Sequence, residues 1–496
     1  DITITVHPSS YLKGFSLEKT LEGHGMPTVL VVNGEHVEEL YEACRATVVV
    51  DGPSAVVCKR SMAPGITGVE GTSQGHDAVA PQSAIPYLES RGHMQAAAYL
   101  KLETVKTSDP RQYVGIGAKD AMRKVVGQTV VDVLSTMTPQ ERKESVMVID
   151  SDLGGSTNFN KIQAAYPEIY VQSGVMERGN FAAAAGFGMH PDKQGVFSTF
   201  AAFLEMCCSE ITMARLNRSN VFSHFSHSGV DDMADNTCHF GINNMFADNG
   251  LEDGYETKLY FPCDPLQAAK VVTRTFPLKG AGFENKGLRF VFTTRSKTPI
   301  LLKEDGSELY GDGYEFVPGK DEVLREGTDG YIVSFGDAVY RCLDAVESLK
   351  KEGINVGLIN KPTLNVTDPE IMEKIVSSSG VRLTRQEDWV GLSEAHDAND
   401  CKIRSSGTCL SILSFRNSIS HAQWRRLTMS LCRLYRTNGR WQLSAIRQTR
   451  FDCQSIGFGM WNAVFRYRVG RSTPGMQSRV GRLSRFATSL CRRVRT

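Results

Sequence analysis

The sequence lacks the features that mark membrane and secreted proteins. None of its 496 residues belongs to an apolar run that approaches the roughly 18 to 20 residues needed to span a bilayer. The first residues do not combine a basic segment with the apolar stretch of a signal peptide. The 12 cysteines include no CxxC pair, which argues against a disulfide framework. We therefore expect a cytoplasmic protein whose thiols, Cys44 and Cys58 among them, are reduced and partly buried.

Acidic residues are almost missing from the last part of the chain. Residues 401–496 carry 18 Arg, one Lys and a single acid, Asp452, whereas the whole chain has a net charge of +1. All four tryptophans lie beyond residue 388. A disordered tail is normally poor in Trp and Cys, and an arginine-rich surface attracts nucleic-acid phosphate. Of three interpretations, a disordered tail, a nucleic-acid-binding tail and an out-of-frame translation, we favour the third, and we expect no nucleic-acid or membrane partner.

The rest of the chain alternates short β-branched runs with amphipathic helical patterns. This alternation is typical of α/β domains with mostly parallel sheets covered by helices. The predicted strands are 28–32, 55–58, 146–149, 289–293, 332–335 and 356–359. Because the chain is too long for one hydrophobic core, we expect several consecutive domains. The predicted segments are 1–108, 109–320, 321–385 and an atypical tail, 386–496.

Helical patterns lie between these strands. The first has Val37 and Tyr41 on its apolar face, and a longer one begins near Ala118. The third follows a helix-start turn at Gly336-Asp337 and directs a stripe toward the core. That stripe consists of Val339, Leu343 and Val346.

The middle unit contains polar residues at odds with their apolar surroundings. Glu177 ends the run Gly-Val-Met-Glu at 174–177, just ahead of the small residues of 182–185. Its carboxylate is either a solvated helix-start residue or a buried group that handles a proton. Phe197, Phe200 and Phe203 follow at helical spacing, which is more often a core pattern than a ring-stacking platform.

A second polar group lies further along the same unit, in what we expect to be a loop after a strand. His224, His227, Asp235 and His239 lie within sixteen residues, and Cys238 adjoins the last of them. A zinc site is one interpretation, but structural zinc sites bring their ligands in close pairs at both ends of a loop. Three histidines near one acid favour a catalytic role instead.

Taken in order, these segments resemble the pyrimidine-binding domain of transketolases. His227, Asp235 and His239 are spaced by eight and then four residues, as in the loop that carries the family's substrate and cofactor histidines. The resemblance extends back through Gly75-His76 and forward through 331–380. The matching motifs are Ser151-Asp152-Leu153, the run 174–177, the run Thr-Phe-Ala-Ala-Phe at 199–203, the His and Asp loop, and Arg295.

The resemblance implies the thiamine-diphosphate-binding fold, followed by a transketolase C-terminal-like domain. It implies that Glu177 hydrogen-bonds the cofactor's pyrimidine ring, and that Phe200 and Phe203 line the slot for that ring, excluding water. His239 and His76 are expected to face the reacting centre as donors or proton shuttles.

The resemblance also assigns residues to the substrate. Asp235 and His227 are expected to meet hydroxyls of the donor sugar, and Asp152 to lie near the cofactor's thiazolium ring. Guanidinium groups grip a phosphate dianion bidentately. The residues that match the family's sugar-phosphate clamp are Arg123, Ser156 and Arg295.

The metal site is where the chain departs most from the family. The family holds the diphosphate and Mg²⁺ or Ca²⁺ with Gly-Asp-Gly followed about thirty residues later by Asn, a set of hard oxygen ligands. This sequence has no such combination, and its start resembles the residues just after that Asn. The resemblance then implies that Ile2 offers its carbonyl to the metal and that Ile4 packs on the thiazolium. We expect an N-terminally truncated chain that binds thiamine diphosphate weakly or not at all.

The function implied is transfer of a two-carbon ketol unit between sugar phosphates, by a homodimer whose active site lies between subunits. Two departures put the substrate in question, because Asn236-Thr237-Cys238 replaces the family's Gly-Pro-Thr and Arg178 replaces its His or Asn. One alternative is another thiamine-diphosphate enzyme, such as dihydroxyacetone synthase or deoxyxylulose-phosphate synthase. The other is a non-catalytic or incomplete remnant that lacks the diphosphate and metal motif.

Overall fold

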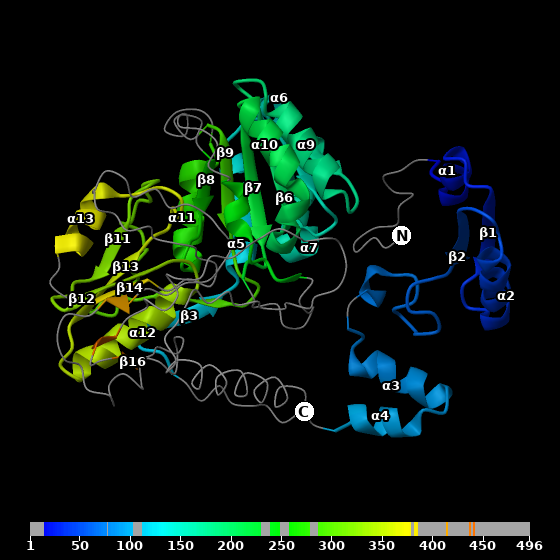
Figure 1. Ribbon diagram of the computed structural model, residues 1–496, viewed down its shortest axis with the longest axis horizontal. Coiled ribbons are helices and arrows are strands. Elements are labelled where there is room, and N and C mark those ends of the chain that lie inside the picture. The colour runs from blue at the N-terminus through cyan, green and yellow to red at the C-terminus, as the bar shows by residue number, and fades with distance from the viewer. Residues whose placement is uncertain are drawn as a thin grey trace, which may run out of the picture. The chain divides into compact units, whose positions relative to one another are not determined.

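The computed structural model describes most of the chain before residue 378 (Figure 1). The described residues are 14–76, 78–102, 112–229, 239–248, 257–277 and 286–377, together with the short strands at 381–384, 413–414, 436–437 and 440–441. The chain divides into two compact units, Asp1–Ser420 and His421–Thr496. Within the described residues no helix is both long enough and apolar enough to cross a membrane.

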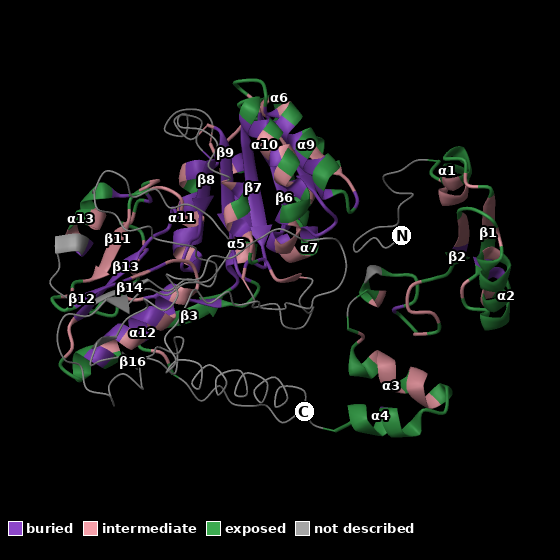
Figure 2. Cartoon of the chain, in the orientation of Figure 1, coloured by how far each residue is buried: buried purple, intermediate pink, exposed green. Residues whose placement is uncertain are grey.

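A six-stranded, wholly parallel sheet forms the centre of the larger unit, and we call it the middle sheet. Its strands run in the order β5-β4-β6-β7-β9-β8. Their bounds are β4 Val146–Asp150, β5 Tyr170–Gln172, β6 Gln194–Phe200, β7 Val221–Ser226, β8 Thr257–Tyr260 and β9 Leu288–Phe292. Strands β6, β7 and β9 are buried along their whole length, as Figure 2 shows in purple. A parallel sheet covered on both faces reads as continuous apolar runs, and from such runs β4 and β9 of this sheet were predicted.

Helices cover both faces of the middle sheet. On one face, α9 (Glu177–Phe187) and α10 (Cys208–Leu216) bury Phe181 and Ile211 against Phe197 and Phe225. On the other, α5 (Met122–Ser135) and α11 (Pro265–Thr275) bury Val126 and Val271 among side chains of alternate sheet positions, such as Val196. The remaining helices of this region are α6 (Pro139–Ser145), α7 (Gly154–Thr157), α8 (Asn160–Ala165) and the 3₁₀ helices η3 (Pro167–Ile169), η4 (Ala201–Cys207) and η6 (Asn244–Ala247).

Helix α9 approaches the sheet closely because small residues face each other. A Cβ placed on Gly195 of β6 would lie 2.0 Å from the carbonyl oxygen of Ala184, so only glycine fits there. Ala184 and Ala185 are buried in the same contact. The run of small residues at 182–185 therefore brings the backbone of α9, whose first residue is Glu177, close to the strand.

A second sheet follows the middle sheet in sequence. Its strands run in the order β11-β13-β12-β14-β15, with β12, β13 and β14 parallel and the two edge strands antiparallel. Their bounds are β11 Glu322–Arg325, β12 Gly330–Ser334, β13 Val356–Asn360, β14 Val381–Thr384 and β15 Leu413–Ser414. Helices α12 (Ala338–Lys351) and α13 (Pro369–Ser377) complete it, and the predicted stripe of Val339, Leu343 and Val346 is buried.

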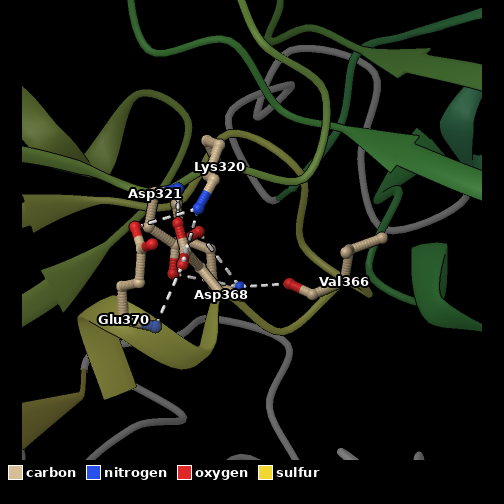
Figure 3. Close-up of polar contacts among 6 residues, drawn as sticks. Lys320, Asp321, Val366, Asp368 and Glu370 are labelled. Atoms are coloured by element: carbon tan, nitrogen blue, oxygen red, sulfur yellow. Dashed lines mark hydrogen bonds and ion pairs between the residues drawn. The ribbon is translucent and has the colours of Figure 1, made fainter. Parts of the chain in front are cut away.

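The segment after β13 ties the second sheet to the edge of the middle sheet. Thr363 forms a bridge with Tyr260 of edge strand β8, and Asn365 accepts the amide hydrogen of Leu259 at 3.0 Å. Lys361 anchors this segment, because its Nζ lies 3.1 Å from Asp321 Oδ1 and 2.5 Å from the carbonyl oxygen of Val366 (Figure 3). A paired edge is also closed to the pairing with other chains that an open sheet edge invites.

Two more carboxylates and one more lysine surround this pair (Figure 3). Lys320 reaches Glu370 at 3.0 Å and Asp368 at 3.5 Å, and Asp368 also accepts the amide hydrogen of Asp321. We call Lys320, Asp321, Lys361, Asp368 and Glu370 the ion cluster. Its inner members are buried, with exposed side-chain fractions of 8% for Lys361 and 2% for Asp321.

The N-terminal segment contains a small β-α-β unit and a helical pair. Its elements are α1 (Leu17–Gly23), β1 (Thr28–Asn33), α2 (Val37–Val48), β2 (Ser54–Lys59), the 3₁₀ helix η2 (Ser73–Gly75), α3 (Pro81–Ser90) and α4 (Met94–Leu100). β1 and β2 are parallel, as predicted. The predicted apolar face of α2 is exposed, with Val37 at 77% and Tyr41 at 59%. Cys44 and Cys58 are exposed as well, so the expectation that these thiols are partly buried was wrong.

The predicted α/β fold with mostly parallel sheets is confirmed, and the six predicted strands agree with the structure to within two residues. Two local predictions were wrong. Phe197 and Phe200 belong to strand β6, not to a helix, and only Phe203 lies on a helix, η4. Ala118, near which we expected a helix to begin, lies on strand β3 (Ile116–Asp120), which pairs with β10 (Thr298–Leu301), and the helix α5 begins at Met122. In the smaller unit, β16 (Arg436–Thr437) pairs with β17 (Arg440–Trp441).

Candidate active site

The predicted site residues gather at one edge of the middle sheet. Asp152 follows β4, Phe200 ends β6, His227 follows β7 and Arg295 lies shortly beyond β9. Since these strands are parallel neighbours, their carboxyl ends meet at the same edge. Ligands of open parallel α/β sheets bind at that edge.

Glu177 is the buried member of the site. It is the first residue of α9, its exposed fraction is 5%, and Thr199 Oγ1 donates to its Oε1 at 3.5 Å. Burial raises the pKa of Glu177, while its own backbone amide and the Thr199 hydroxyl lower it. Of the two interpretations left open by the sequence, the structure therefore supports the buried carboxyl group. Its place at a helix N-terminus offsets part of the cost of burying a negative charge.

An open pocket of about 700 Å³ gives access to Glu177. At its mouth, Arg178 donates from Nε and Nη2 to Glu210 Oε1 at 2.9 and 2.8 Å, so this departure from the family is held in an ion pair. The pairing raises the pKa of Arg178 and lowers that of Glu210. The residues lining the pocket are Met176, Glu177, Arg178, Gly179, Glu205, Met206 and Ser209.

Four rings cluster where β6 and β7 end, and we call them the ring slot: Phe200, Phe203, His227 and His239. Phe200 and Phe203 stack with centroids 5.9 Å apart and an interplanar angle of 14°. The imidazole of His227 lies 3.8 Å from the ring of Phe200. His239 meets Phe200 and Phe203 edge-on at 5.8 and 5.5 Å. The structure thus brings together both predicted phenylalanines and two of the predicted histidines.

His227 is held in a strained backbone conformation and is neutral. Its φ of +58° lies in the left-handed region, which non-glycine residues adopt mainly at special sites. Its Nδ1 lies 2.9 Å from Ser226 Oγ. Burial lowers the pKa of His227 to about 3, and the charges of Arg123 and Arg295 lower it further in the same direction. At neutral pH the imidazole therefore carries one ring proton.

Arg123, Ser156 and Arg295, which we call the clamp, are joined by backbone contacts. Arg123 Nε donates to the carbonyl oxygen of Arg295 at 3.2 Å, and its Nη1 donates to the carbonyl oxygen of Ser156. Ser156 is half-buried and Arg295 is exposed. The guanidinium of Arg123 thus links the loop after β4 to the loop after β9.

Two buried residues of the site were missed from the sequence. Asp150 ends β4, and its carboxylate accepts the amide hydrogen of Leu153 at 2.6 Å and the hydroxyl of Thr157 at 3.4 Å. Burial raises the pKa of Asp150 to about 7, and the charge of Asp152 makes a smaller contribution in the same direction. The backbone of Asp152 is left-handed, with a φ of +62°. The sequence signal that could have identified Asp150 is an acidic residue at the end of the apolar run of β4.

Asn180 is the second residue that was missed. Its Nδ2 donates to Ser151 Oγ and to the carbonyl oxygen of Gly174, both at 3.0 Å, and its Oδ1 accepts from Ser173 at 2.7 Å. It therefore joins the loop before Glu177 to the loop that carries Asp152. Asn at the third position after Glu177 gave no recognisable signal in the sequence.

The structure does not relate the remaining predicted residues to this site. Ile2, Ile4 and Asp235 lie outside the described residues. His76 is exposed after η2 in the N-terminal segment, whose position relative to the middle sheet is not defined. Their roles stay predictions.

The zinc interpretation gains no support from the residues that the structure describes, which contain no group of three or more His, Cys, Asp or Glu that could hold a metal. His224 is fully buried on β7 and bonds Thr293 Oγ1 at 2.9 Å. The tripeptide Gly311-Asp312-Gly313, between β10 and β11, has the residues of the first part of the family's metal motif. Asp312 is exposed there, and the next Asn, Asn355, lies too far along the chain to match the family's metal motif.

An α/β sheet with a buried carboxylate, a ring slot and two arginines at its carboxyl edge defines the class of this protein. Two parts of the chain match domain models of the transketolase family. Residues 121–275 match the family model "Transketolase, pyrimidine binding domain", and residues 319–398 match "Transketolase, C-terminal domain". The predicted family is thereby confirmed.

Curated relatives with transketolase names match the chain at low sequence identity. The chain is 23% identical over 396 residues to human "Transketolase", covering 76% of this chain and 59% of the relative. It is 22% identical over 401 residues to bovine "Transketolase-like protein 1", covering 77% and 63%, and 21% identical over 394 residues to human "Transketolase-like protein 2", covering 75% and 59%. The chain thus spans about 60% of the length of these relatives.

Two solved structures resemble parts of the chain. Transketolase from Campylobacter jejuni has a TM-score of 0.44 and 18% identity, covering 75% of this chain and 63% of that one. A structure titled "Split gene transketolase, inactive beta4 tetramer" has a TM-score of 0.44 and 24% identity, covering 54% and 80%.

Proposed function

We propose that this chain supplies the pyrimidine-binding side of a thiamine-diphosphate-dependent site that transfers a two-carbon ketol unit between sugar phosphates. The observation that carries the proposal is the buried Glu177, which lines a pocket of about 700 Å³ and bonds Thr199, the residue next to Phe200 of the ring slot. A buried acid with a raised pKa in a pocket is the usual mark of a proton-handling group.

The residues present fit the pyrimidine part of the cofactor. A planar heterocycle needs apolar walls and a polar group at its edge, and Phe200 and Phe203 with Glu177 offer both. When bound, thiamine diphosphate supplies a carbanion that attacks ketone carbonyls and stabilises the resulting negative charge.

Glu177 holds the proton in this scheme. Its raised pKa favours the protonated carboxyl group, which can donate a hydrogen bond to a ring nitrogen. Thr199 bonds Oε1, and we assign the other oxygen to the ligand. Because the neighbouring rings exclude water, this hydrogen bond is stronger than it would be in solvent.

The histidines and the clamp act on the substrate. His227 is neutral, so it can donate to or accept from a sugar hydroxyl without changing its charge. We assign His239, His76 and Asp235 to the same end of the substrate, and Asp152 to the thiazolium side. Arg123 and Arg295 bind the phosphate, which favours phosphorylated sugars. Dihydroxyacetone synthase chemistry remains an alternative. Deoxyxylulose-phosphate synthase chemistry remains a related alternative.

The diphosphate and its Mg²⁺ or Ca²⁺ need further ligands. Ile2 offers a backbone carbonyl and Ile4 a packing surface, but the sequence has no Gly-Asp-Gly followed about thirty residues later by Asn. We assign the missing ligands to a second polypeptide or to further sequence, and the active site to the interface of a homodimer. The same observation favours a second candidate, a non-catalytic binding partner that retains this half-site.

Calorimetric titration with thiamine diphosphate and Mg²⁺ tests the two candidates. The chain alone is expected to bind weakly or not at all. Adding the separately produced diphosphate-binding domain of human transketolase is expected to give cofactor binding and ketol transfer from a ketose phosphate to an aldose phosphate. Cofactor binding without transfer supports the non-catalytic partner, and binding that E177Q leaves unchanged overturns the assignment of Glu177.

A further inference from the structure

A row of polar side chains crosses the middle sheet beneath the clamp, on a face that is otherwise apolar. Asp150 is in register with Ser198, and Ser198 with His224, on three adjacent parallel strands. The same face carries Val148, Val196 and Phe222, because side chains alternate along each strand. His224 then reaches Thr293 just beyond β9. We call Asp150, Ser198, His224 and Thr293 the polar row.

Two atoms in the polar row have no protein partner. Ser198 and His224 both have an exposed fraction of 0%. Ser198 Oγ and His224 Nδ1 have no hydrogen-bond partner among the described residues. An unpaired buried polar atom costs about 1–3 kcal/mol. Neighbouring strands lie about 4.8 Å apart, so two in-register side chains on one face are close enough for one water to bridge them.

The two ends of the polar row reach both loops of the clamp. Asp150 accepts from Leu153 and Thr157, and so holds the loop that carries Asp152 and Ser156. Thr293 lies two residues before Arg295, and its carbonyl oxygen accepts the amide hydrogen of Ser228. Above the row, Arg123 bonds the backbone of both loops. The polar row therefore links the same two loops from below.

We propose that Ser198 and His224 bind an internal water, and that His224 is a positioning residue that sets the spacing of the clamp. Internal waters typically make about three hydrogen bonds to buried polar groups. Ser198 Oγ and His224 Nδ1 supply two of these, and Asp150 lies in register with Ser198 on its other side. The charged groups that face His224 are Arg123 above and Asp150 along the row.

This assignment requires one tautomer of the imidazole. Nδ1 accepts from the water and Nε2 donates to Thr293, so the ring is neutral. Burial and the charge of Arg123 lower the pKa of His224 to about 3, in agreement with a neutral ring. Ser198 then donates to the water or accepts from it according to the protonation of Asp150.

A double-mutant cycle tests the water site without any ligand. S198A and H224F are each made in the full chain, singly and together, and the urea midpoint is followed by far-ultraviolet circular dichroism. If both residues hold one water, H224F removes at least half of the effect of S198A. T293V replaces H224F in the cycle if the phenylalanine variant fails to fold. Additive effects in both cycles overturn the proposal.

The positioning role rests on the proposed function and has its own measurement. The probe is inorganic phosphate, titrated calorimetrically against the chain. S198A is expected to weaken its binding by about three- to ten-fold, the loss of one hydrogen-bonded link. The matched control is S223A. Ser223 precedes His224 on β7, so its side chain lies on the other face of the sheet, and its hydroxyl is also fully buried and unpaired.

Equal weakening by S198A and S223A overturns the positioning role. If the parent chain binds no phosphate, the clamp of the proposed function fails, and the coupling between Ser198 and His224 decides the water site alone.

Discussion

The imidazole of His227 lies 3.8 Å from the ring of Phe200, at an interplanar angle of 30°. This contact joins the ends of β6 and β7 and places a neutral histidine against the slot that Phe200 forms with Phe203. Burial keeps the imidazole uncharged, so the contact involves no cation over the ring. The site therefore separates its functions, with proton handling at Glu177 and charge at the two arginines.

The first prediction concerns Glu177. E177Q keeps the shape of the side chain and removes the ionisable group, so ketol transfer by the reconstituted site should fall by about 10²- to 10⁴-fold. Burial raises the folded-state pKa of Glu177, so the stability linked to this group is present below its ordinary pKa and is lost as pH rises through the raised value. E177Q should match the parent in urea unfolding at acidic pH and exceed it at pH 8.

E205Q is the control for this prediction. Glu205 lines the same pocket but is exposed. Its variant should leave both ketol transfer and the pH dependence of unfolding unchanged. A parent and an E177Q protein with identical pH profiles of unfolding would contradict the buried state of Glu177.

The second prediction concerns the electrostatic link between Arg295 and His227. R295Q should raise the pKa of His227, because a positive charge that disfavours the imidazolium is removed. The pKa should still stay below its ordinary value, since burial is the larger cause. Nuclear magnetic resonance of ¹⁵N-labelled histidine measures both effects. K297Q removes an exposed cation two residues away, and an equal shift in that variant would contradict a specific contact.

Two strands of each sheet, β4 and β9 in one and β12 and β13 in the other, could be predicted because buried parallel strands are continuous apolar runs. The helical spacing of Phe197, Phe200 and Phe203 misled because β6 turns directly into η4, so one three-residue interval lies on a strand and the next crosses a turn. Local periodicity cannot reveal such a junction. Local periodicity also could not reveal that the apolar face of α2 is exposed, because exposure depends on which other elements pack against the helix.

The candidate site was predictable only where side chains form motifs. The burial of Glu177 depends on Thr199, which is 22 residues away in sequence, and that contact exists only once α9 lies on β6. Asp150 and Asn180 act through backbone groups, which any sequence supplies, and through hydroxyl groups of nearby loop residues. Their roles therefore follow from the folded loops and leave no pattern in the residue order.

The third prediction concerns the close approach of α9 to β6. A Cβ on Gly195 would meet backbone atoms of Ala184 at 2.0 to 2.7 Å, so G195A must push the helix and the strand apart. The expected loss is about 3 kcal/mol of the free energy of unfolding, as for other overpacked cores. G186A is the control, because a Cβ on this exposed helical glycine meets nothing within 4 Å. It should stabilise the protein by about 0.5–1 kcal/mol.

Circular dichroism, and not tryptophan fluorescence, should follow these transitions, because all four tryptophans lie beyond residue 388. A G195A protein as stable as the parent would contradict the packing of α9 against β6. Since that packing also places the first residue of α9, G195A should lower cofactor binding by the reconstituted site along with stability.

The fourth prediction concerns the buried pair Lys361 and Asp321 in the ion cluster. K361A leaves the carboxylate of Asp321 buried without its cation, which typically costs about 3–5 kcal/mol of the free energy of unfolding. Burial raises the pKa of Asp321 to about 6, although Lys361 lowers it. Without the lysine the carboxyl group takes up a proton more readily, so the cost of K361A should be smaller at pH 5 than at pH 8.

Urea unfolding at the two pH values measures this difference, and two further variants interpret it. K320A removes the half-exposed lysine of the same cluster and should cost no more than about 1 kcal/mol. The double variant K361M/D321N removes both charges and should recover most of the stability lost in K361A, because no unpaired charge remains. If K361A and K320A lower the free energy of unfolding by the same amount, Lys361 is not the anchor of the segment that pairs with β8. Limited proteolysis after residue 360 should then be no faster in K361A than in the parent.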